Sequence, residues 1–123
     1  MDTSDSKKDL EWVDLTFLRT YSGGDKELMK KFIQTFLTRT PESIQQMENA
    51  LATKDLHAIT SIAHNLRPQL SYMGITKATD LVKSIEESAK DGKDAEDLSA
   101  KFNRVKEMVL KAYEELERQL NLL

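Results

Sequence analysis

His64 and Arg67 are the two residues of this 123-residue chain whose types and spacing suggest chemistry. A neutral imidazole is nucleophilic near neutral pH, and one ring nitrogen can attack while the other orients the ring. Arg67 follows three residues later, so on a helix both side chains lie on one face. A guanidinium in this position holds an anionic phosphoryl group beside the histidine. The pair has the chemistry of a phosphoryl acceptor with a stabilising cation, although a histidine on a helix is most often only a surface residue.

The sequence around His64 reads as one amphipathic helix over about residues 56–73. At 100° per residue, its apolar side chains form a single stripe on the side away from His64. The members of that stripe are Leu56, Ile59, Ile62, Ala63, Leu66, Leu70 and Met73. The face of His64 carries small or polar side chains besides Arg67, namely His57, Thr60, Ser61, Pro68 and Ser71. We expect these five residues to contact a docking partner.

Pro68 predicts a local defect in this helix. Proline lacks the N–H that would bond to the carbonyl four residues back, which here belongs to His64. One interpretation is a kink that is tolerated because the face is open to water. The other is a kink that sets the reach of His64 and leaves a low surface for a partner.

Composition excludes several classes of function. The chain has 18 Lys and Arg against 21 Asp and Glu, a net charge of −3, so nucleic acid and anionic membranes are not expected partners. It has no cysteine, and no apolar run long enough to span a membrane. His57 and His64 are too far apart to chelate one metal without a third ligand, and we predict no metal site. We expect a cytoplasmic monomer, with residues 1–9 as a disordered leader and residues 10–123 as one domain.

Helical patterns joined by short turns account for the chain, and no segment reads as a strand. A short helix is expected within residues 10–21, starting near Asp14. Further helices are expected over residues 26–38, after the Thr40-Pro41 start signal, over 77–89 and over about 95–119. Because every predicted element is a helix, we predict an all-α fold. Short connections favour antiparallel neighbours, so we expect the helices to run antiparallel. The predicted architecture is an antiparallel up-down four-helix bundle with one or two short accessory N-terminal helices.

Polar residues beside these segments are expected to cap the helices. Asp25 follows a Gly-Gly turn and Asp55 precedes the helix of His64, so each can accept from free N–H groups at a helix start. Thr76 is expected to cap the helix that follows Gly74. Gly74 itself is predicted to be the structural turn that ends the helix of His64.

The combination of these residues resembles a known family. His64-Asn-Leu66-Arg67, with Gly74 ten residues after the histidine, is similar to the core motif of histidine-containing phosphotransfer (HPt) domains. That pattern is His-x-Leu-Lys-Gly, then small residues, then an apolar-Gly pair. The chain departs from it at Arg67, which keeps the charge of the lysine, at Pro68 in place of Gly, and at the larger pair that follows, Gln69 and Leu70. A stretch nearer the N-terminus also resembles the family, through Leu15, Leu18, Gly23, Gly24, Asp25, Glu27 and Leu28.

The resemblance implies that His64 takes a phosphoryl group from the aspartate of a response-regulator receiver domain and passes it to another receiver. Its implied partners are such receivers and a hybrid sensor histidine kinase, and the receiver brings the Mg²⁺. The chain has no Gly-rich nucleotide loop, so we expect no intrinsic cofactor and no autonomous kinase activity. The alternative from another class is a non-catalytic helical interaction module with the same fold. A metal-binding bundle is disfavoured because no Glu-x-x-His is present.

Overall fold

The structure is a computed structural model that describes residues 10–92 and 95–123. The predicted leader, residues 1–9, and part of the predicted turn over residues 90–94 lie outside the described residues. Within the described ranges all regular structure is helical. The helices are α2 (Thr16–Tyr21), α3 (Lys26–Ala52), α4 (Leu56–Tyr72), α5 (Thr76–Lys90) and α6 (Ala95–Leu122). The predicted all-α class is confirmed.

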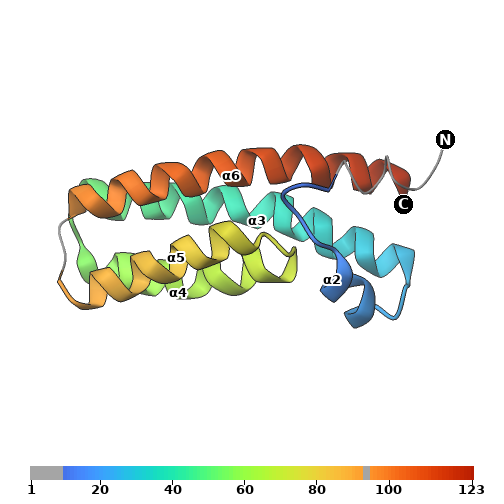
Figure 1. Ribbon diagram of the computed structural model, residues 1–123, viewed down its shortest axis with the longest axis horizontal. Coiled ribbons are helices and arrows are strands. Elements are labelled where there is room, and N and C mark those ends of the chain that lie inside the picture. The colour runs from blue at the N-terminus through green and yellow to red at the C-terminus, as the bar shows by residue number, and fades with distance from the viewer. Residues whose placement is uncertain (1–9, 93–94) are drawn as a thin grey trace.

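Helices α3 to α6 form an antiparallel up-down bundle, and α2 packs at one end of it (Figure 1). Helix α4 lies between α3 and α5, while α6 closes the ring by packing on α5 and α3. Helices α4 and α6 are therefore diagonally opposite. The buried apolar side chains of all four helices and of α2 make one core. No helix of the described ranges combines the length and apolar character needed to cross a membrane.

Helix α3 corrects the prediction that one helix ends near residue 38 and another begins at Pro41. The structure has a single helix from Lys26 to Ala52, with Pro41 inside it. Proline cannot bond to the carbonyl four residues back, which belongs to Leu37. The Tyr113 hydroxyl of α6 donates to that carbonyl at 3.4 Å. A tertiary hydrogen bond thus replaces the missing helical one, and this is why the start signal was misleading.

The predicted helix caps are partly confirmed. The Asp25 carboxylate accepts from the amides of Glu27 and Leu28, and the Asp55 carboxylate accepts from the amide of Ala58. The prediction for Thr76 was wrong, because Thr76 is already the first residue of α5 and no side chain caps that helix.

The segment before α2 differs from the predicted helix, which was expected to start near Asp14. Residues 10–15, here called the N-terminal strap, are not helical, and α2 begins only at Thr16. The backbone amides of the strap are used elsewhere. That of Asp14 donates to the carbonyl of Met73 at 3.1 Å, and those of residues 11–13 bind a carboxylate of α6. The described residues therefore contain one accessory helix.

Candidate functional site

Helix α5 places a buried carboxylate beside the face of α4 that carries His64. Glu86 follows Val82 by four residues and precedes Ala89 by three, so it lies on the same stripe of α5 as these two buried residues. Its side chain is only 4% exposed. A buried carboxylate needs partners to compensate for its lost hydration. Glu86 finds them in the side chains of α4 and in its own helix.

His64 is oriented by this carboxylate. Its Nδ1 lies 3.0 Å from Oε2 of Glu86, while 68% of the His64 side chain remains exposed. An ionised carboxylate can only accept hydrogen bonds, so Nδ1 carries the proton. In the neutral ring, the lone pair is then on Nε2. The nucleophilic nitrogen is thus the one that Glu86 does not use.

Two cations share the same carboxylate. Arg67 donates from a guanidinium nitrogen to Oε1 of Glu86 at 2.8 Å, and Nζ of Lys90 lies 3.5 Å from Oε2. Burial by itself raises the pKa of Glu86, but the hydrogen bonds from Arg67 and His64 outweigh it and hold that pKa below the ordinary value. Glu86 is therefore ionised at neutral pH. The site consists of one buried anion surrounded by an imidazole and two partly exposed cations.

Four of the residues predicted to be in the site line one cavity, and three others lie on the same helix outside it. His64, Arg67, Pro68 and Ser71 line an open cavity of about 350 Å³, together with Thr79 of α5. The other predicted docking residues, namely His57, Thr60 and Ser61, are on the same helix but do not line this cavity.

Pro68 is exposed and does not interrupt α4, which continues to Tyr72. The next residue, Gln69, links α4 to α3. Its side-chain oxygen accepts from the Thr40 hydroxyl at 3.3 Å, and its side-chain nitrogen donates to the Ser43 hydroxyl at 3.4 Å. Leu70 is fully buried. The larger residues that replace the small ones of the HPt pattern are therefore used for packing between α3 and α4.

Gly74 ends α4 as predicted, and the structure adds a second reason for glycine. Its φ is +66°, which L-residues with a side chain rarely adopt. In addition, the strap crosses it so closely that a Cβ would overlap the carbonyl oxygen of Asp14. The amide of Asp14 bonds to the carbonyl of the preceding residue, Met73, at 3.1 Å. The glycine is thus a contact point for the strap as well as a turn.

Sequence reasoning missed Glu86, Lys90 and Thr79, all from α5. It found no acidic residue near His64 because the carboxylate comes from a different helix. One signal was present, since a glutamate at the fourth position after Val82 places a charge in an apolar stripe. Such a charge indicates a buried partner, though not which one. Within residues 10–92 and 95–123, no three His, Asp or Glu side chains gather closely enough to hold a metal ion.

Of three comparisons with known proteins, one found a match. A search of curated proteins and a search of solved structures each gave no significant match. The family model described as "Hpt domain" matches residues 31–120, which include all the side chains of the site. The motif around His64, the helical bundle and this match together show that the chain belongs to the Hpt domain family, whose members transfer phosphoryl groups in two-component signalling and interact with response regulators and kinases.

Proposed function

We propose that this chain is a phosphorelay carrier in which Nε2 of His64 accepts a phosphoryl group from a receiver aspartate and passes it to the aspartate of another receiver. The observation that carries the proposal is the hydrogen bond between Nδ1 of His64 and buried Glu86, since it directs the lone pair to the exposed nitrogen. A histidine that served only as a surface residue would have no need of a buried carboxylate behind it.

The transfer of the phosphoryl group to Nε2 needs no proton acceptor. The lone pair of Nε2 attacks phosphorus, the N–P bond forms, and the P–O bond to the receiver aspartate breaks, which leaves that aspartate as a carboxylate. The proton on Nδ1 stays in place, so the phosphorylated ring is a cation. Glu86 stabilises this cation from 3.0 Å in a largely buried position, where electrostatic attraction is stronger than in water. The reverse attack by a second receiver returns the ring to its neutral state.

Arg67 and Lys90 supply positive charge for the phosphoryl oxygens. Both contact Glu86 and both remain partly exposed. Phosphoryl transfer depends on positioning and on stabilising the charge of the transferred group. Arg67 lines the cavity of His64 and is the better placed of the two. The Mg²⁺ of the reaction would be brought by the receiver.

The test is phosphate transfer from a panel of phosphorylated receiver domains to the wild-type chain and to His64→Gln. We expect label on the wild type, lost in the variant, with the acid lability and base stability of a phosphoramidate. His57→Gln is a matched control, because His57 is an exposed histidine of the same helix that does not line the cavity. It should still carry its label on His64, because the attacking nitrogen is unchanged whatever the substitution does to docking.

Label that persists in His64→Gln would overturn the assignment of the residue. If no receiver labels the wild type while a control HPt domain is labelled, the carrier function is wrong. Phosphate-independent binding of a partner would then favour the interaction module.

A further inference from the structure

The N-terminal strap is held by a second buried carboxylate, far along α6. Glu115 is 4% exposed and accepts from three consecutive backbone amides, those of Glu11, Trp12 and Val13, at 2.8 to 3.0 Å. Charge-assisted bonds of this kind are stronger than neutral ones. Successive amides that converge on one anion also fix the backbone path of the segment that supplies them.

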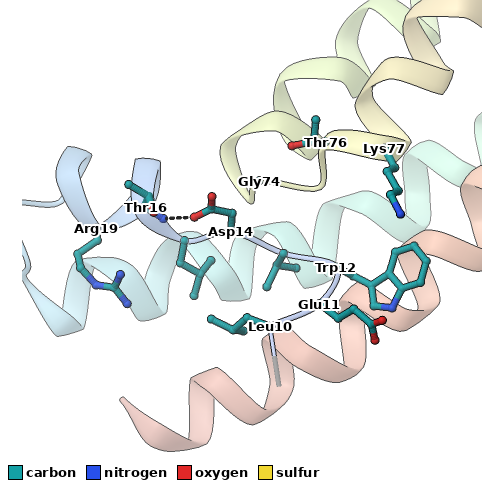
Figure 2. A pocket seen from close by; sticks show the side chains of 11 residues that line it. Leu10, Glu11, Trp12, Asp14, Thr16, Arg19, Gly74, Thr76 and Lys77 are labelled. Atoms are coloured by element: carbon teal, nitrogen blue, oxygen red, sulfur yellow. Dashed lines mark hydrogen bonds between the residues drawn. The ribbon is translucent and has the colours of Figure 1, made fainter. Parts of the chain in front are cut away.

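Two further contacts fasten the strap across the bundle end. Trp12 contacts two ammonium groups, with Nζ of Lys111 on α6 at 4.8 Å and Nζ of Lys77 on α5 at 5.5 Å from the centre of its ring. Figure 2 shows the strap passing from α6 to the turn at Gly74, with Trp12 beside Lys77. The strap therefore connects α6 with the end of the helix that carries His64.

Helix α2 follows the strap directly and buries little surface of its own. It has only six residues and buries only one of them, Leu18. Its exposed side carries Phe17 and Tyr21, and Phe17 stacks on Tyr72 of α4 at 5.2 Å between ring centres. Tyr21 meets Phe32 of α3 edge to face at 5.5 Å. Because α2 buries so little of its own surface, we infer that the strap helps to fix where these rings lie.

The rings line a groove of about 540 Å³ between α2, α3 and α4, here called the aromatic groove. Phe17 is 47% exposed and Tyr72 is 53% exposed, so the groove presents apolar area to solvent. Pro68 lines both this groove and the cavity of His64. The two surfaces are therefore continuous.

The usual size of a protein interface implies that the protein that occupies the groove is the same receiver that reaches His64. A standard interface covers about 800 Å² on each partner, a disc of about 16 Å radius. Tyr72 is eight residues after His64 on α4, which is about 12 Å along the helix axis. A receiver centred on His64 thus covers the aromatic groove, and exposed aromatic rings are the side chains that contribute most to such interfaces.

We propose that Glu115 is a positioning residue for receiver docking, because through the strap it holds the rings of α2 in the aromatic groove where the receiver binds. This inference rests on the proposed function. It assigns receiver affinity partly to a carboxylate on α6, the helix diagonally opposite α4. The chemistry at Nε2 of His64 does not involve it.

The experiment separates docking from chemistry by using two phosphodonors on the full chain. Phosphoramidate is a small donor that can reach His64 without a receiver, whereas a phosphorylated receiver must transfer its group through the interface. For Phe17→Ser and for Glu115→Gln, we expect the KM for the phosphorylated receiver to rise about tenfold, with kcat and the phosphoramidate rate unchanged. Amide hydrogen exchange at Trp12 and Val13 should become faster in Glu115→Gln only.

The double variant tests whether the two residues act on the same surface. If Glu115 acts through the rings of α2, the double variant has a KM no higher than the worse single variant. A product of the two effects, about a hundredfold, would overturn the proposal. So would a wild-type KM in Glu115→Gln with faster exchange in the strap, or an equal fall of the phosphoramidate rate.

Leu110→Ser is the matched control, because Leu110 is an exposed apolar residue of α6, and its KM should stay at the wild-type value. Should Glu115→Gln fail to fold, Glu115→Asp keeps the charge one methylene further from the strap and is judged by the same criteria. If neither donor labels wild-type His64, the proposed function is refuted instead. Normal label with an unchanged KM in Phe17→Ser refutes only the docking inference.

Discussion

Glu86 and Glu115 are both buried to the same extent, yet their partners differ in kind. Glu86 is bonded by side chains, those of His64, Arg67 and Lys90, and each of these partners remains partly exposed. Glu115 is bonded by backbone amides of the strap, for which the described residues offer no other acceptor. A carboxylate that binds side chains tunes their chemistry, and one that binds backbone fixes the chain. Burial alone does not distinguish a functional carboxylate from a structural one.

The largest expected effect is on stability, and it should separate the two glutamates. Glu115→Ala leaves the amides of the strap without an acceptor and should cost about 3 kcal/mol in the free energy of unfolding. Glu86→Ala should cost about 1 kcal/mol, because His64 and Arg67 can turn to water. Urea unfolding of both variants and the wild type, followed by circular dichroism, measures the difference. Equal costs would show that the strap amides find other acceptors.

The next largest effect is on the reactivity of His64, and here the substitution of Glu86 should matter more than that of Glu115. Glu86→Gln keeps the shape of the side chain but removes the charge that stabilises the phosphorylated ring. We expect phosphorylation of His64 by phosphoramidate to slow about tenfold, equivalent to about 1.4 kcal/mol. Glu115→Gln should leave this rate unchanged. A similar fall in both variants would mean that the strap influences His64 directly.

The comparison also explains what the sequence could predict. The helix of His64, its exposed face, the caps at Asp25 and Asp55 and the bundle all follow from local patterns of apolar and polar residues. The merging of two predicted helices into α3 does not, because the group that compensates Pro41 is Tyr113, 72 positions later in the chain. Glu86 and Glu115 were missed for the same reason. Both are glutamates whose hydrogen-bond partners come mainly from other segments, and a pattern within one segment does not identify those partners.

Tyr113 is a partly buried polar side chain, and it resembles Glu115 because its hydrogen-bond partner is a backbone group. Burial raises the pKa of Tyr113 to about 12, so its hydroxyl remains a donor throughout the neutral range. Tyr113→Phe removes the bond to the carbonyl of Leu37 and should cost about 1 kcal/mol without changing the phosphoramidate rate. Pro41→Ala restores a helical N–H for that carbonyl. In the Pro41→Ala background, therefore, the cost of Tyr113→Phe measured by urea unfolding should decrease, and an unchanged cost would exclude this compensation.

The smallest expected effect is the pH dependence of stability that Glu86 contributes. Its pKa in the folded chain lies below the ordinary value near 4.5, since the hydrogen bonds from Arg67 and His64 outweigh the effect of burial. The folded state therefore holds this proton less tightly than the unfolded state. The stabilisation is fully present above the ordinary value and is lost as the pH falls through the lowered one.

The stability difference between the wild type and Glu86→Gln should thus be constant from pH 7 to about pH 5.5 and decrease by less than about 1 kcal/mol below it. Urea unfolding of both proteins at each pH measures this, with the same pair compared in a His64→Gln background to isolate the share of Arg67. A difference that grows on acidification would mean that burial dominates at Glu86, and the contrast with Glu115 would then rest on their hydrogen-bond partners alone.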